Sequence, residues 1–219
     1  MIVLAQGYLM LVLHNHLPFV RHPEYDNFLE ERWLFEATLE SYLPILYHLD
    51  RLNREGIDYN ITLSYSPTLL TMFNDELLQN RFKRHIEKLL ELGQKEIKRT
   101  ASKPEHALAK MYKNRLIKMY AFYQDRCRGN LINLLRELKS TGKVELITCS
   151  ATHGFLPFMR EEAVEAQIAV AVSTYQRFFQ DKPPGIWLPE CAYAPGIERV
   201  LQDHGLKYFF LDTHGVTLA

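Results

Sequence analysis

Residues 185–193 read Gly-Ile-Trp-Leu-Pro-Glu-Cys-Ala-Tyr, a short apolar run that passes directly into a carboxylate. The run is continuous and shows no alternation of polar and apolar side chains, which is typical of a strand that is covered on both faces. A buried strand has no structural need to end in a charged residue. Glu190 is therefore the first candidate for a functional side chain.

Four other apolar runs have the same organisation, and we expect each of them to be a strand. With the run above, the predicted strands span residues 8–14, 59–64, 144–149, 185–188 and 207–211. Between them, apolar residues recur at helical spacing, and the predicted helices span 28–54, 68–92, 104–127, 130–140, 161–179 and 195–204. Pro44 lies inside the first of these helices, so we expect a kink or a break there.

This order of strands and helices predicts an α/β fold with a parallel sheet and right-handed crossovers, either a doubly wound open sheet or a barrel. The helices between the second and third strands, at about residues 68–141, are too long for a simple crossover and are interpreted as a helical insertion. No GxGxxG or GxxxxGK[ST] pattern follows any predicted strand, so the usual nucleotide-binding loops are excluded.

Polar side chains follow the end of every predicted strand. They occur in the segments His14-Asn-His16, Ser64-Tyr-Ser66, Ser150-Ala-Thr-His153, Pro189-Glu190 and Asp212-Thr-His214. In a parallel sheet these ends lie on one face, and that face of a β/α barrel is where active sites are found. The agreement among the strands predicts a functional site at this end of a barrel.

Glu190 lies between two aromatic residues, Trp187 and Tyr193. A carboxylate at the mouth of a barrel can act as the nucleophile or the acid/base in glycosyl transfer, and aromatic rings suit the C–H faces of sugars. The alternative is a glutamate that forms a salt bridge in a loop. The position directly after a buried strand favours the functional interpretation.

His14 and His16 form an HxH pair with two possible roles. They could be metal ligands together with His153 and with Asp212 or His214. Alternatively, neutral histidines could form hydrogen bonds with substrate hydroxyl groups, and either one could simply be packed in the core. Cys149 and Cys191 are expected to pack as small apolar groups.

Composition narrows the class of protein. The chain has 219 residues, with 26 basic and 26 acidic side chains and a net charge of +0, which argues against a nucleic-acid-binding surface or a polybasic membrane patch. Three cysteines without CxxC spacing argue against a disulfide framework or structural zinc. Residues 1–13 lack the basic start of a signal peptide. We therefore expect a monomeric cytoplasmic protein that binds neither membranes nor nucleic acids.

Four segments together resemble glycoside hydrolase family 57, with the 1,4-α-glucan branching enzymes and their α-amylase-like relatives as the most similar subgroup. The segments are His14-Asn-His-Leu-Pro18, Glu30-Glu-Arg-Trp-Leu-Phe-Glu-Ala37, Ala151-Thr-His-Gly-Phe-Leu-Pro157 and Trp187-Leu-Pro-Glu-Cys-Ala-Tyr193. The resemblance implies an incomplete, TIM-like (β/α)7 barrel with a helical insertion. It also implies retaining glycosyl transfer on α-1,4-glucans such as amylose or glycogen-like chains, without a metal or any other cofactor.

On this resemblance, Glu190 matches the nucleophile and His16 matches the histidine of the first motif. His14 and His153 match histidines that line the subsite where the glycosyl-enzyme intermediate forms. Trp187, Asp212 and His214 are further candidates for substrate binding.

The family's second carboxylate, an aspartate that acts as acid/base, belongs to a later motif that has no match in this sequence. Residues 1–219 are therefore expected to be the N-terminal part of a catalytic barrel, truncated on its C-terminal side and inactive alone. Three alternatives to branching remain: an α-amylase-type hydrolase, an inactive carbohydrate-binding remnant, and a metal-dependent hydrolase or deacetylase that uses His14, His16 and His153.

Overall fold

The computed structural model describes residues 7–217, which form two compact units. The first unit contains the chain up to residue 18, residues 58–70 and the chain from residue 138 onward. The second contains residues 19–57 and 71–137. The expectation about a signal peptide lies partly outside the described residues, because it includes residues 1–6.

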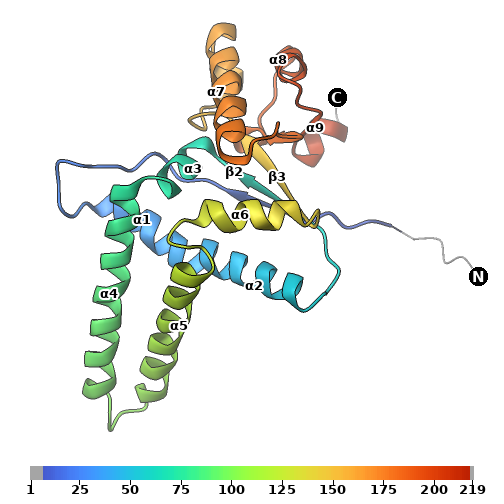
Figure 1. Ribbon diagram of the computed structural model, residues 1–219. Helices are drawn as coiled ribbons and strands as arrows, with labels where there is room; N and C mark the ends of the chain where they lie inside the picture. The colour runs from blue at the N-terminus through green and yellow to red at the C-terminus, as the bar shows by residue number, and fades with distance from the viewer. Residues whose placement is uncertain (1–6, 218–219) are drawn as a thin grey trace, which may run out of the picture. The chain divides into compact units, whose positions relative to one another are not determined.

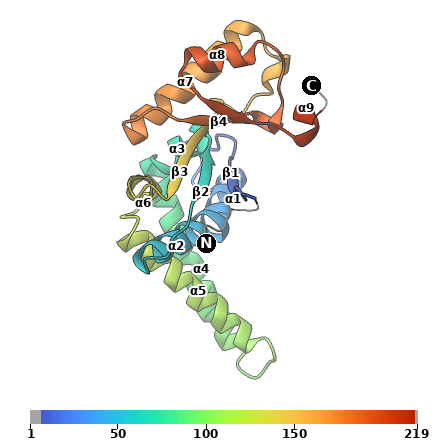
Figure 2. The same cartoon turned by 90° about the vertical axis from the view of Figure 1, so that its right-hand side faces the viewer.

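The first unit is built on a sheet of five parallel strands whose spatial order is their order in the sequence (Figures 1 and 2). The strands are β1 (Val12–Asn15), β2 (Ile61–Tyr65), β3 (Val144–Cys149), β4 (Gly185–Trp187) and β5 (Tyr208–Phe210). Each strand pairs in parallel with the next. This topology, with helices between the strands, confirms the predicted parallel barrel-type sheet with a helical insertion after the second strand.

Three helices and two short 3₁₀ turns within residues 7–217 lie entirely in the first unit. They are η2 (Leu156–Phe158), α7 (Glu161–Phe179), η3 (Pro189–Cys191), α8 (Ile197–Asp203) and α9 (Thr213–Thr217). Residues of α7, α8 and β4 share a buried hydrophobic cluster that includes Ile186 and Leu188. Because Leu188 is completely buried and Glu190 is exposed, the core holds the chain firmly up to the point where the carboxylate emerges.

The second unit is helical. It contains α1 (Leu29–Ala37), the π-helical turn η1 (Thr38–Tyr42), α2 (Leu43–Arg54), α4 (Glu76–Arg99) and α5 (His106–Asp125). Helices α3 (Pro67–Phe73) and α6 (Leu131–Ser140) each contribute residues to both units. Helices α4 and α5 run side by side (Figure 1), and an edge-to-face contact between Phe82 and Tyr123, with ring centroids 5.0 Å apart, lies in their seam.

The irregularity expected at Pro44 is present as a π-helical turn. The backbone N–H of Leu43 donates to the carbonyl of Thr38, five residues earlier, and α2 begins at Leu43 with Pro44 in its first turn. Proline has no N–H and its ring crowds the carbonyl of the preceding turn, so the helix widens just before it. The chain thus continues in helical geometry where the sequence allowed either a kink or a break.

The predicted first strand is wrong for residues 8–11. The strand begins at Val12, opposite Thr62 of β2, whereas Tyr8 and Leu9 are 97% exposed. Since β2 begins at Ile61, residues 8–10 extend past the end of their partner strand and cannot be covered by it. Strand β3 and helix α7, in contrast, match the predicted ranges residue for residue.

The helix predicted over residues 68–92 is two helices. Helix α3 ends at Phe73, and α4 begins at Glu76 and runs to Arg99. Asp75 caps α4, because its carboxylate accepts a hydrogen bond of 3.0 Å from the backbone N–H of Leu78. An aspartate favours this capping geometry over a continuous helix.

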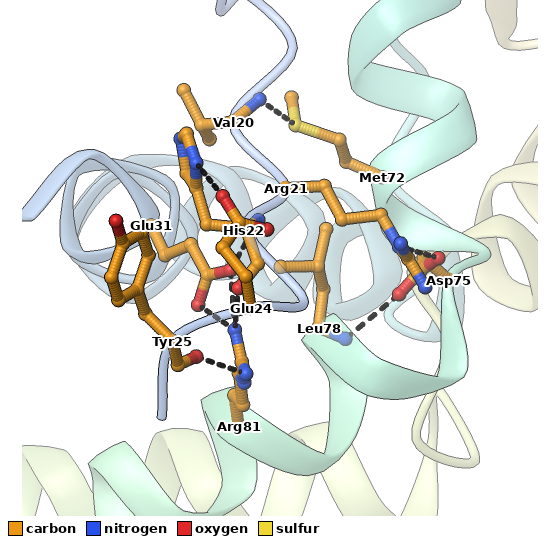
Figure 3. Close-up of polar contacts among 10 residues, drawn as sticks. All are labelled: Val20, Arg21, His22, Glu24, Tyr25, Glu31, Met72, Asp75, Leu78 and Arg81. Carbon is orange, nitrogen blue, oxygen red and sulfur yellow. Dashed lines mark hydrogen bonds and ion pairs between the residues drawn. The ribbon is translucent and has the colours of Figure 1, made fainter. Parts of the chain in front are cut away.

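A buried ion pair in the second unit fixes the loop before α1 (Figure 3). Arg81 of α4 donates to both carboxylate oxygens of Glu31 in α1, at 2.6 and 2.8 Å, and the two side chains are only 5% and 1% exposed. Arg81 also donates to the carbonyls of His22 and Tyr25, and Glu31 accepts from the backbone N–H of His22. These extra hydrogen bonds compensate the desolvation of both charges and tie down a loop that has no secondary structure.

We predict that Glu31→Gln lowers the free energy of unfolding by about 3–5 kcal/mol, because it leaves the Arg81 guanidinium buried without a counter-charge. Urea unfolding followed by circular dichroism measures the change. The matched control is Glu36→Gln, which removes an exposed partner of Arg32 and should cost less than about 1 kcal/mol. Equal losses in the two variants would contradict the role given to the buried pair.

Candidate active site

The parallel register of β1 and β2 places two histidines beside two serines. His14 lies directly opposite Ser64 in the sheet, and its Nδ1 is 3.1 Å from the Ser64 hydroxyl oxygen. His16, just past the end of β1, has its Nδ1 2.9 Å from the hydroxyl oxygen of Ser66. In the sequence, Ser64-Tyr-Ser66 was only a polar strand end. In the structure, its two serines are the hydrogen-bond partners of the two histidines of the HxH pair.

The hydrogen bonds around Ser64 determine the tautomer of His14. The Ser64 hydroxyl donates its single proton to the carbonyl oxygen of Thr148, at 3.3 Å. It must therefore accept from His14, so that Nδ1 of His14 carries the proton and Nε2 has the lone pair. Nε2 of His14 lies 3.0 Å from Nε2 of His153, which consequently donates to it and keeps its own Nδ1 unprotonated.

The same reasoning applies to His16. Thr68 donates its hydroxyl proton to the carbonyl of Leu17, at 2.9 Å. Ser66 therefore donates to Thr68 across 3.1 Å and accepts from His16. Nδ1 of His16 carries the proton, and its Nε2 is left as a hydrogen-bond acceptor.

Ring stacking completes the histidine cluster, which we define as His14, His16, His153 and Trp187. The rings of His16 and His153 stack with centroids 3.8 Å apart and an interplanar angle of 15°. Trp187 of β4 stacks on His14 at 4.8 Å and 9°. Residues from β1, β4 and the loops that follow β1 and β3 thus meet, as the barrel interpretation predicted.

All three histidines of this cluster are neutral at neutral pH. Burial, followed by the charges of His153 and His16, lowers the pKa of His14 to about 3. Burial and His153 lower the pKa of His16 to about 4. Burial also lowers the pKa of His153, although the carboxylate of Glu190 acts in the opposite direction. Neutral rings are required for the tautomers assigned above.

Glu190 lies on η3 with its backbone in the left-handed region, at φ 55° and ψ 24°, and Cys191 follows at φ 51°. Consecutive non-glycine residues in this region are uncommon and cluster at functional sites. The Glu190 side chain is exposed, and within residues 7–217 it forms neither a hydrogen bond nor an ion pair. Its carboxylate is thus not held in a surface salt bridge, the alternative considered from the sequence.

Glu190 lines an open cavity of about 460 Å³ in the first unit. Asp212 and His214, both exposed, line the same cavity. Its wall also contains exposed aromatic side chains that sequence reasoning missed: Phe158 is 89% exposed and Phe155 is 40% exposed. Their signal was the segment Phe155-Leu-Pro-Phe158, which directly follows a predicted site histidine.

The predicted site residues therefore fall into two groups within one unit. His14, His16, His153 and Trp187 form the histidine cluster, and Glu190, Asp212 and His214 line the cavity. The two groups interact electrostatically: burial lowers the pKa of His153, and the Glu190 carboxylate opposes that shift. Among the helices within residues 7–217, none combines the length and apolar character needed to cross a bilayer.

Comparisons with known proteins give a consistent picture. The family model for glycosyl hydrolase family 57 matches residues 10–219. The 1,4-alpha-glucan branching enzyme of Thermococcus kodakarensis is 39% identical over 95% of this chain, which covers 33% of that protein. Among solved structures, the alpha-amylase AmyC of Thermotoga maritima is 42% identical with a TM-score of 0.93, over 98% of this chain and 41% of its own.

A branching enzyme from Pyrococcus horikoshii is 36% identical with a TM-score of 0.89, and the match covers 96% of this chain and 42% of that one. This chain therefore spans about a third to two fifths of the length of the relatives it matches.

The tautomer assignment predicts that the two serines act on separate histidines. Ser66→Ala should convert His16 to a mixture of tautomers and leave His14 unchanged, whereas Ser64→Ala should do the reverse, because each variant removes one acceptor. Nitrogen-15 NMR of labelled histidines distinguishes protonated from unprotonated ring nitrogens. An unchanged His16 spectrum in Ser66→Ala would contradict the assignment.

The lowered histidine pKa values also predict a pH dependence of stability. Between pH 6.5 and about pH 4 the unfolded chain binds protons at His14 and His16 that the folded chain does not. The free energy of unfolding therefore falls as the pH falls through this window. Urea unfolding across it should show a shallower fall in His16→Gln than in the wild type. An identical slope would contradict the low pKa of His16.

Proposed function

Because this chain belongs to glycosyl hydrolase family 57, we propose that it is the N-terminal part of a catalytic barrel that transfers glucosyl groups of α-1,4-glucans with retention of configuration. Glu190 is the nucleophile in this proposal. The observation that carries it is an exposed carboxylate without a polar partner among the described residues, in a cavity of about 460 Å³. Cavities of about 300–1,000 Å³ are typical of small-molecule sites.

The geometry of Glu190 supports the role of nucleophile. A carboxylate that attacks a sugar carbon needs an unshared oxygen, and a salt bridge or a strong hydrogen bond would reduce its nucleophilicity. The left-handed backbone at Glu190 turns the chain sharply after the buried Leu188. Strained backbone of this kind clusters at functional sites, which supports a functional origin for the turn.

The histidine cluster would bind the sugar next to the bond that breaks. With the tautomers assigned above, His16 offers Nε2 and His153 offers Nδ1 as acceptors for sugar hydroxyl protons. Neutral acceptors in a partly buried site discriminate well between sugars that supply a hydroxyl and those that do not, because an unpaired buried polar group is costly.

This proposal does not assign the second carboxylate that a retaining mechanism needs. The two carboxyl groups of a retaining enzyme lie about 5–5.5 Å apart. Asp212 is the other acid that lines the Glu190 cavity, but it does not match the family's acid/base motif. We therefore assign Asp212 and His214 to substrate binding and expect the acid/base from elsewhere in a full-length enzyme.

Branching is the favoured reaction, and hydrolysis is the second candidate. The likeness to branching enzymes from Thermococcus kodakarensis and Pyrococcus horikoshii supports transfer to another glucan chain. The likeness to an alpha-amylase from Thermotoga maritima supports transfer to water. The two reactions share the nucleophile and differ in how well water is excluded from the intermediate. A monomeric, cytoplasmic protein stays a prediction.

We predict that 5-fluoro-α-glucosyl fluoride labels this chain covalently at Glu190. Fluoride leaves without help from a general acid, so the experiment tests the nucleophile independently of the second carboxylate. Mass spectrometry should show one added 5-fluoroglucosyl group on the peptide that contains Glu190. The label should be absent in Glu190→Gln and present in Glu162→Gln, which changes an exposed glutamate at the start of α7.

Amylose provides the complementary measurement. We expect residues 1–219 to release no reducing ends from amylose and to leave its iodine staining unchanged. Labelling at another residue, or labelling that survives Glu190→Gln, would contradict the proposed nucleophile. Turnover of amylose that requires both Glu190 and Asp212 would instead show that this chain holds the complete pair of carboxyl groups. Glucan binding without labelling would favour a carbohydrate-binding remnant.

A further inference from the structure

His14, Cys149 and His153 bring two imidazoles and a thiol to one point in the first unit. One ligand atom from each residue lies within 4.8 Å of the other two. The three come from β1, the end of β3 and the loop that follows β3. We propose that these three side chains form a binding site for a thiophilic divalent cation of the Zn²⁺ class, a site that goes beyond the proposed glycosyl transfer.

The two imidazole nitrogens are nearly at the spacing that zinc requires. Their Nε2 atoms are 3.0 Å apart, and two nitrogens bound to tetrahedral zinc at about 2.0–2.1 Å are separated by about 3.3 Å. An ion would therefore take the place of the proton that His153 now shares with His14, after a small opening of the pair. The sulfur of Cys149 must approach by about 1 Å to reach a normal Zn–S bond of about 2.3 Å.

The groups behind these ligands already hold them in place. Nδ1–H of His14 donates to Ser64, and Ser64 donates to the carbonyl of Thr148, the residue before Cys149. A ligating histidine almost always has such a partner on its other nitrogen, which fixes the ring and its tautomer. The Ser64 hydroxyl thus links His14 to the backbone next to Cys149. It also leaves Nε2 of His14 free to face His153.

The ligand set selects the class of ion. A thiolate with two imidazoles favours Zn²⁺ and its analogue Co²⁺ over Mg²⁺ or Ca²⁺, which prefer oxygen. Burial raises the pKa of the Cys149 thiol to about 12, and the Glu190 carboxylate acts in the same direction, so the ion must displace the thiol proton as it binds. Water can occupy the fourth position of a tetrahedral site.

The protons balance without any change in oxidation state. Cys149 gives its thiol proton to solvent and binds as a thiolate. His153 moves its proton from Nε2 to Nδ1, so the imidazole stays neutral. Binding therefore releases one proton per ion. On the proposed function, the ion would occupy the histidines that bind the sugar, so metal and glucan would exclude one another.

The test is a titration of the 219-residue chain with Co²⁺ under reducing, anaerobic conditions. We expect binding of one ion per chain, with a thiolate-to-cobalt charge-transfer band in the near ultraviolet that Zn²⁺ abolishes by displacement. Cys149→Ser should remove this band, and Ser64→Ala should weaken binding by about tenfold or more. The control is Cys127→Ser. It changes a cysteine that is also buried but lies in the second unit, and it should bind Co²⁺ as the wild type does.

Zinc K-edge X-ray absorption of the zinc-bound wild-type chain identifies the ligands without any substitution. It should show one sulfur and two imidazole ligands. A band that survives Cys149→Ser, a band lost only in Cys191→Ser, or a zinc shell without sulfur would overturn the proposal. Failure to bind one equivalent of Co²⁺ would also overturn it. None of these outcomes depends on glucan turnover, so the metal site and the glycosyl transfer can fail separately.

Discussion

The parallel pairing of β1 with β2 is the constraint from which the chemistry of the site follows. It places His14 opposite Ser64, and the next pair, His16 and Ser66, forms the same contact just beyond the strand end. Side chains two residues apart lie on the same face of a strand. A shift of register by one residue would turn both histidines to the other face and remove both serines from reach.

The serine hydroxyl groups determine which ring nitrogen of each facing histidine carries the proton. A serine has one proton, and once its donation to a backbone carbonyl or to Thr68 is fixed, the protonation of the facing histidine is fixed as well. The buried pair of Glu31 and Arg81 shows the same principle with charges, because its spare hydrogen bonds hold the loop at residues 22–25. In both units, hydrogen bonds between buried polar groups specify local structure.

Much of this could be predicted from the sequence, for identifiable reasons. Strand β3 and helix α7 have clear hydrophobic patterns and clear ends, and both were predicted to the residue. The meeting of His14, His16 and His153 followed from a general property of parallel sheets, whose strand ends lie on one side. The start of β1 was not predictable, because residues 8–11 are as apolar as the strand itself, and only the end of the partner strand shows where pairing stops.

The tautomers and the position of Cys149 depended on the structure. Sequence reasoning treated Cys149 as a small packing residue, which fits its complete burial, but gave no indication that its sulfur lies near two imidazoles. The approach of His14 to both Cys149 and His153 joins residues more than a hundred positions apart. Such contacts depend on strand order and on rotamers rather than on any local pattern, so no spacing rule in the chain reveals them.

The orientation of the hydrogen bonds in the histidine cluster has a consequence for selectivity. Because the free ring nitrogens of His16 and His153 both carry lone pairs, these nitrogens can accept hydrogen bonds but cannot donate them. An ether oxygen placed there would find no donor from these two rings. O-methylated or otherwise capped glucans would therefore be rejected on chemical grounds even where their added bulk could be accommodated.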